Sequence, residues 1–198
     1  MKNKDAPGQN CQTTIKIDET YHSALKRNLN EVVIAKLEFE AYREIGNKVL
    51  LNFPNSFFWL SGTALFNDMM AHMIKVFDRD AQSATFWYIF RCKSKDIKKF
   101  IKENNIDFMS IYDFAEKLKQ VRDKTHFHID KKGVKNPAGI WKSADISYNE
   151  LKANIDAVYK ILNYLHVNEF EFDFLIPKID DLQYIIKAAI DAEYITKK

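Results

Sequence analysis

The sequence has little glycine, proline or cysteine, and each shortage excludes a class of structure. Five glycines and four prolines among 198 residues are too few for a sandwich or barrel of many short strands. The two cysteines, Cys11 and Cys92, form no C-x-x-C pair, so we expect neither a disulfide framework nor a cysteine metal site. Residues 1–13 lack the apolar core of a secretory signal, and no apolar run approaches the ~18 residues of a spanning helix. We therefore expect a cytoplasmic protein with reduced thiols and no membrane contact.

Apolar side chains, by contrast, are abundant, and they recur three and four positions apart along most of the chain. Hydrophobic residues make up 46% of the sequence, and this spacing predicts helices. The expected helices cover residues 18–45, 56–78, 83–91, 95–103, 109–126, 147–166 and 179–195. Residues 169–174 alternate with period two, and we expect an extended connector there because a lone strand has no partner. The sequence thus predicts an all-α helical bundle, a single domain over residues 17–198 behind a flexible lead at residues 1–16.

Two of the expected helices are dense enough in apolar residues to be central in the bundle. The segment 56–78 is apolar almost all round, and the segment 109–126 carries one apolar stripe. We therefore expect the side chains of Trp59 and Phe66, both in the first of these helices, to be buried.

The charge of the chain is nearly balanced overall but uneven along its length. The formal net charge is +3, yet residues 131–142 carry four lysines and no acid. Such a segment can follow a phosphate backbone, and a tryptophan within it can stack on a base. The candidate RNA-binding residues are Lys131, Lys132, Lys135, Trp141 and Lys142. The alternative is a solvated surface with unevenly distributed charge.

Arg122 is the residue of the expected helix 109–126 that fits its surroundings least. At about 100° per residue it falls within about 20° of Ile111 on the apolar stripe. A guanidinium there is costly unless it is paired or faces a cleft. His126 follows one turn later on the same face, and His128 lies near the expected helix end. These residues could form a site for an anion, or the arginine could extend to the bundle edge while the histidines cap the helix.

A metal site is a competing interpretation of the same histidines. His126 and His128, with Asp68 and His72 one turn apart on the helix 56–78, are residue types that bind divalent ions. Their spacing matches no strong signature, and the charge of Arg122 disfavours a cation, so we expect no metal and no cofactor. In that case Asp68 and His72 are supporting residues, and Asp68 is a candidate partner of Arg122.

Arg122 and His128, with five residues between them, resemble the Arg-x(4–6)-His motif of the HEPN superfamily. The surroundings resemble its abortive-infection AbiU-like branch, in which a helix ending in Phe-Asp precedes a segment Leu-Arg-Asn-Lys-x-x-Ala-His-x-Asp. This sequence has Val76-Phe-Asp-Arg79 and then Val121-Arg-Asp-Lys-Thr-His-Phe-His-Ile-Asp130. It departs from the pattern at Asp123, where asparagine is usual, and at Phe127, where alanine is usual. The resemblance covers residues 55–132.

The resemblance implies a homodimeric helical bundle that cleaves RNA without a metal, in the manner of a toxin or phage-defence protein. Arg122 and His128 would be the catalytic residues, and Asp123 the polar residue beside the arginine. His126 has no counterpart in the family and is a candidate only through its position one turn after Arg122. An antitoxin protein would be a further partner. The alternative that the resemblance leaves open is a non-catalytic module that binds RNA or protein.

Overall fold

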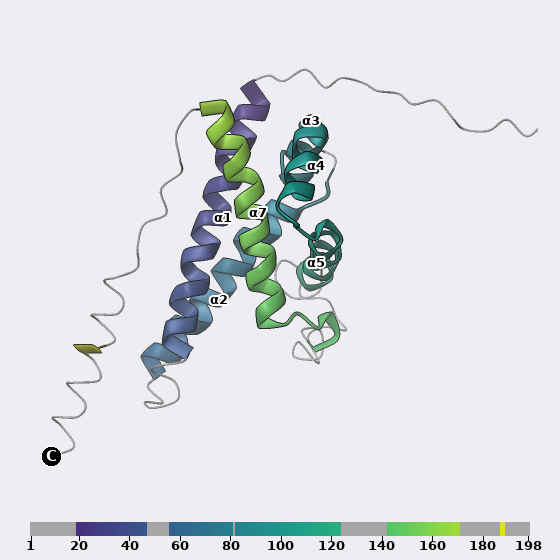
Figure 1. Ribbon diagram of the computed structural model, residues 1–198. Helices are drawn as coiled ribbons and strands as arrows, with labels where there is room; N and C mark the ends of the chain where they lie inside the picture. The colour runs from purple at the N-terminus through teal and green to yellow at the C-terminus, as the bar shows by residue number, and fades with distance from the viewer. Residues whose placement is uncertain (1–18, 47–55, 81, 124–141, 171–186, 189–198) are drawn as a thin grey trace, which may run out of the picture.

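The computed structural model describes residues 19–46, 56–80, 82–123, 142–170 and 187–188, and its architecture is all-α (Figure 1). The helices are α1 (Glu19–Ile45), α2 (Ser56–Phe77), α3 (Phe86–Cys92), α4 (Ser94–Glu103), α5 (Phe108–Val121) and α7 (Tyr148–Phe170). Within these ranges no residue belongs to a strand, which confirms the predicted helical bundle. No helix in the described ranges is both long and apolar enough to cross a membrane.

The three long helices form the framework of the bundle. Helix α1 packs along both α2 and α7, and α7 also contacts α4 and α5. In Figure 1, α7 therefore lies between α1 and the group formed by α3, α4 and α5. The end of α2 reaches this group too, because α2 contacts α3 and α5.

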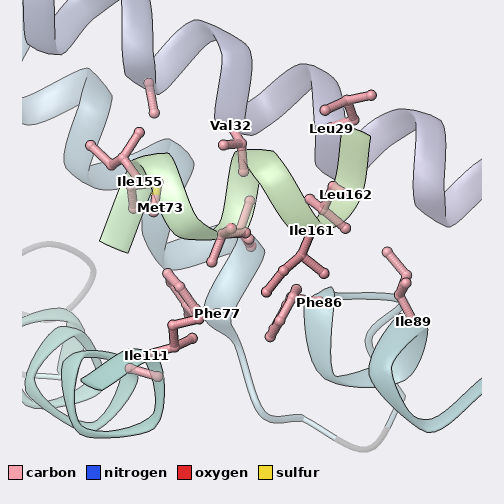
Figure 2. Close-up of a cluster of buried hydrophobic side chains, with 14 of the residues drawn as sticks. Leu29, Val32, Met73, Phe77, Phe86, Ile89, Ile111, Ile155, Ile161 and Leu162 are labelled. Carbon is pink, nitrogen blue, oxygen red and sulfur yellow. The ribbon is translucent and has the colours of Figure 1, made fainter. Parts of the chain in front are cut away.

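One apolar core joins all of these helices. Figure 2 shows side chains from five helices meeting in it, among them Val32 of α1, Phe77 of α2, Phe86 of α3, Ile111 of α5 and Ile161 of α7. The rings of Phe77 and Phe114 meet edge to face at 5.7 Å, which joins α2 directly to α5. This contact holds the last turn of α2 beside α5.

The predicted helix boundaries agree with the structure to within three residues, except at the ends of α5 and α7. Helix α5 ends at Val121 rather than at residue 126, and residues 124–126 lie outside the described residues. Helix α7 continues through Glu169 and Phe170, which we had predicted to begin an extended connector. The period-two pattern was misleading because both residues have partners across the bundle. Glu169 binds Lys93 (2.5 Å), and the ring of Phe170 packs against His22. The predicted connector beyond residue 170, the lead at residues 1–16 and the helix 179–195 lie outside the described residues, except that residues 187–188 are helical.

The prediction that Trp59 is buried is wrong. The side chain of Trp59 is 61% exposed, and those of Phe57 and Leu60 are exposed to a similar degree. Phe66, by contrast, is partly buried against the core. The fully buried apolar side chains of α2 begin only at Met69, because α3 and α5 pack on the second half of the helix. Among the described residues, nothing covers the face of α2 that carries Trp59.

The start of α5 depends on a side-chain cap. The Asp107 carboxylate accepts hydrogen bonds from the backbone N–H groups of Met109 (2.9 Å) and Ser110 (3.1 Å). We predict that Asp107→Ala lowers the free energy of unfolding by about 1 kcal/mol, since two N–H groups lose their acceptor. Asp107→Asn, which keeps an acceptor oxygen, should retain most of the stability. Urea denaturation of both variants tests this, and equal losses would contradict it.

Candidate functional site

Helix α5 brings Arg122 to the edge of the bundle. The buried stripe of α5 runs from Ile111 to Val121, and the N–H of Arg122 still bonds to the carbonyls of Leu118 and Lys119. The side chain of Arg122 is 27% exposed, so the guanidinium reaches the surface rather than the core. The sequence analysis predicted that a guanidinium on the apolar stripe is costly unless it is paired or faces a cleft. Both conditions are met, because Arg122 is paired and lies beside a pocket.

Two carboxylates hold the guanidinium of Arg122. Its Nη1 donates to Asp78 Oδ1 (2.6 Å), and its Nε donates to Asp123 Oδ1 (2.8 Å). Nη2 has no acceptor among the described residues. Burial lowers the pKa of Arg122, but its hydrogen bonds to Asp123 and Asp78 raise it by more, so the net shift is upward. The arginine is therefore a fixed positive charge whose Nη2 binds none of the described residues.

Asp78 is itself held in place by the turn that follows α2. Its Oδ1 also accepts from the N–H of Asp80 (3.2 Å), and its backbone carbonyl accepts from the hydroxyl of Thr85 (2.8 Å). Asn28 of α1 donates to the carbonyl of Ala84 (2.8 Å), which attaches the turn to the bundle. Hydrogen bonds thus connect the carboxylate that binds Arg122 to the bundle.

Arg79, the next residue along, links the same turn to α5. It forms an ion pair with Glu116, and its guanidinium lies over the rings of Tyr112 (3.9 Å) and Trp87 (4.7 Å). Its Nε is buried and has no hydrogen-bond partner among the described residues. Arg79 therefore carries a second positive charge beside Arg122, already partly compensated by Glu116.

A pocket of about 310 Å³ opens between the end of α2 and the end of α5. Its charged lining is Asp78, Arg79, Asp80, Lys119 and Arg122, which gives three cations against two carboxylates. Lys119 is exposed, and its ammonium has no ion-pair partner among the described residues. Since Nη2 of Arg122 and the Lys119 ammonium are both available, the pocket can accept an anionic group at this edge of the bundle.

The structure brings together only some of the residues that the sequence singled out. Arg122 and Asp123 are in contact, but Asp68 does not pair with Arg122 as we had suggested. Asp78, the first residue after α2, takes that position. Of the candidate RNA-binding residues, Lys142 is described and exposed. The remaining candidates lie outside the described residues: His126, His128, Lys131, Lys132, Lys135 and Trp141.

Asp68 and His72 belong to a separate cluster between α1 and α2. His72 Nδ1 lies 2.6 Å from Glu31 Oε2, and His72 Nε2 lies 3.8 Å from Asp68 Oδ1. Glu38 of α1 completes the cluster. These residues therefore do not support the Arg122 site.

Sequence reasoning did not identify Asp78, Arg79 and Lys119 as members of the site. A signal was present for the first two, because Phe77-Asp78-Arg79, at the end of α2 and just beyond it, is part of the pattern that resembles the AbiU-like branch. The pattern does not say which side chain pairs with Arg122, since that depends on how α2 and α5 pack. Lys119 carried no signal beyond its place one turn before Arg122.

Comparison with known proteins gives no further guide to this site. The chain matches no model of a protein family, no curated protein and no solved structure.

Proposed function

We propose that the protein is a metal-independent endoribonuclease of the toxin or phage-defence type, with Arg122 and His128 as its catalytic residues. The observation that supports the proposal is the way in which the guanidinium of Arg122 is held. Its guanidinium is fixed by Asp78 and Asp123 at a pocket, with Nη2 free and the ammonium of Lys119 nearby. This arrangement suits a phosphate group, because arginine offers a planar set of donors and lysine a second positive charge.

The reaction needs only proton transfer and charge stabilisation from the protein. The 2′-oxygen of RNA attacks the adjacent phosphorus, and the bond from phosphorus to the 5′-oxygen breaks. A histidine takes the proton of the 2′-hydroxyl, and a second acid protonates the leaving 5′-oxygen. Arg122 stabilises the negative charge that grows on the phosphate oxygens. The products are a 2′,3′-cyclic phosphate and a 5′-hydroxyl.

A homodimer would supply the second acid. The resemblance to the HEPN superfamily implies that two Arg122/His128 pairs lie near one groove, so that the His128 of one copy is base and that of the other is acid. Light scattering should then give about twice the 23.3 kDa mass of one chain at micromolar concentration. A single species at the mass of one chain would contradict the dimer.

The cleavage assay tests the proposal directly. A labelled pool of single-stranded RNA is incubated with the purified protein in EDTA, and the ends of the products are determined. We expect cleavage with cyclic phosphate ends, and cleavage slower by about 10²-fold or more with an Arg122→Ala preparation purified in the same way. A protein that cleaves no RNA with or without added metal would contradict the proposal, as would equal cleavage by the variant, which indicates a contaminant.

A second candidate function, a module that binds another protein, is favoured by one observation. Phe57, Trp59 and Leu60 at the start of α2 are each more than 60% exposed. Exposed aromatic and aliphatic side chains in one segment are typical of interaction surfaces. An antitoxin or a second copy of the chain are partners that such a surface could bind. Failure of the cleavage assay would make this the preferred function.

A further inference from the structure

The facing sides of α1 and α2 carry a cluster of four titratable side chains that the proposed ribonuclease does not use. Glu31 and Glu38 are seven residues apart on α1, and Asp68 and His72 are four apart on α2, so each pair lies on one helix face. The side chains of Glu31, Glu38 and His72 are mostly buried, whereas that of Asp68 is exposed. The packing of α1 on α2 therefore brings three carboxylates around one imidazole.

The two nitrogens of His72 have different surroundings. Nδ1 lies 2.6 Å from Glu31 Oε2, close enough for a strong hydrogen bond. Glu31 is in turn bound by Lys75, whose ammonium lies 3.2 Å from the same oxygen. A proton held on Nδ1 by this carboxylate leaves the lone pair of Nε2 available. Nε2 lies 4.0 Å from Glu38 Oε2 and 3.8 Å from Asp68 Oδ1, too far for hydrogen bonds.

The side chain of Glu38 gives a second observation, besides the geometry of His72, that points to a bound cation. Its Oε2 is buried and has no hydrogen-bond partner among the described residues. A buried carboxylate oxygen without a donor is costly unless a proton or a cation binds it.

We propose that Glu38, Asp68 and His72 bind a divalent transition-metal ion, with Zn²⁺ as the best fit. One ligand atom from each lies within 4.8 Å of the others. Ligand atoms that share a tetrahedral zinc ion at about 2.1 Å are about 3.4 Å apart, so the side chains need move only by about half an ångström to close on the ion. Glu31 is then a positioning residue, because a carboxylate on the far nitrogen orients a metal-binding histidine.

The site also has a route to solvent. Glu38 and Asp68 line a second pocket, of about 460 Å³, whose other walls are mainly apolar side chains from the end of α1 and the start of α2. Three protein ligands leave a coordination position for water, and the pocket lets an ion enter and a small ligand approach that position.

The donor set distinguishes among metals. One imidazole nitrogen with two carboxylates suits Zn²⁺ and its first-row neighbours, whereas Mg²⁺ prefers oxygen alone and retains its water. Lys75 and Arg27 form ion pairs with Glu31, and the charge of Lys75 also acts on Glu38. The proposal does not depend on ribonuclease activity, because this cluster shares no residue with the Arg122 site.

The test uses the full-length chain without a histidine tag, freed of metal by a chelator and dialysis. Isothermal titration with ZnCl₂ should give one ion per chain, and MgCl₂ at the same concentration should give no comparable heat. CoCl₂ should produce visible d–d absorption bands that Zn²⁺ then abolishes. The thermal unfolding midpoint should rise with saturating Zn²⁺.

Variants locate the ion. We expect His72→Gln and Glu38→Gln to weaken Zn²⁺ binding at least 100-fold, and Glu31→Gln to weaken it about 10–100-fold. His22→Gln is the matched control, because His22 also contacts a carboxylate, that of Glu169, but does not belong to the cluster and lies nine residues before Glu31 on α1. It should bind Zn²⁺ as the parent chain does. Circular dichroism verifies that each variant is folded.

Two results would overturn the proposal. One is the absence of Zn²⁺ and Co²⁺ binding to the metal-free chain at 100-fold molar excess. The other is unchanged binding by folded His72→Gln. In either case Glu38, Asp68 and His72 do not form a metal site. RNA cleavage in EDTA is measured separately, so failure of the metal site and failure of the ribonuclease are distinguishable.

Discussion

Arg122→Ala and His128→Ala should each reduce RNA cleavage by about 10²–10⁴-fold, the largest change in activity that we expect of any single substitution. Arg122→Ala removes the donors that would stabilise the transition state, and it also leaves Asp78 without its strongest partner. That loss should lower the free energy of unfolding by about 1–3 kcal/mol, because a partly buried carboxylate loses a charged hydrogen bond. Single-turnover kinetics with a labelled RNA measure the first effect and urea denaturation the second.

Three further variants show whether the loss is chemical. Arg122→Lys keeps the charge but not the planar set of donors, so activity should stay low while much of the stability returns. Lys99→Ala, at an exposed position of α4, should cleave as the parent chain does. His126→Ala tests the assignment of the histidine. If it alone abolished cleavage and His128→Ala did not, the role of His128 inferred from the resemblance would be wrong.

Phe114→Ala should produce the largest loss of stability, about 3–5 kcal/mol. Phe114 is fully buried in α5, and its ring meets that of Phe77 edge to face. Truncation leaves a cavity at the point where α5 joins α2, and the surrounding helices cannot close it without shifting. Thermal or urea unfolding followed by circular dichroism measures the change.

Met109→Ala is the matched control on the same helix. Its side chain is 62% exposed, so the expected change in unfolding free energy is within about 0.5 kcal/mol. Similar losses for the two variants would mean that α5 is not held by its buried stripe.

The helices could be predicted from the sequence because the pattern that indicates each helix lies within one segment of the chain. Three- and four-residue spacing of apolar side chains predicted α1, α2 and the start of α5 at nearly their observed bounds. The two errors arose where tertiary contacts override local pattern. Phe170 extends α7 because it packs against His22, and Trp59 is exposed because the neighbouring helices cover only the second half of α2. Neither the packing of Phe170 nor the exposure of Trp59 can be predicted from the periodicity of one segment.

The site was less predictable, because its members come from different helices. The cost of a guanidinium on an apolar stripe identified Arg122 correctly as a residue that needs a partner. Which carboxylate that partner would be depends on how α2 packs on α5, and the sequence suggested Asp68 where the structure has Asp78. For the same reason Glu31 and Glu38 were missed, since only the packing of α1 on α2 brings them to His72.

The packing of α1 against α7 also bears on synthesis at the ribosome. Lys36 of α1 pairs with Asp156 of α7, and the two residues are 120 positions apart in the chain. At 5–20 residues per second, the stripe of α1 that faces α7 waits on the order of ten seconds for its partner to be translated. During that time α2 can cover only one side of α1. The nascent chain therefore exposes an apolar helix face, and truncation before residue 148 should yield a chain that aggregates or recruits chaperones.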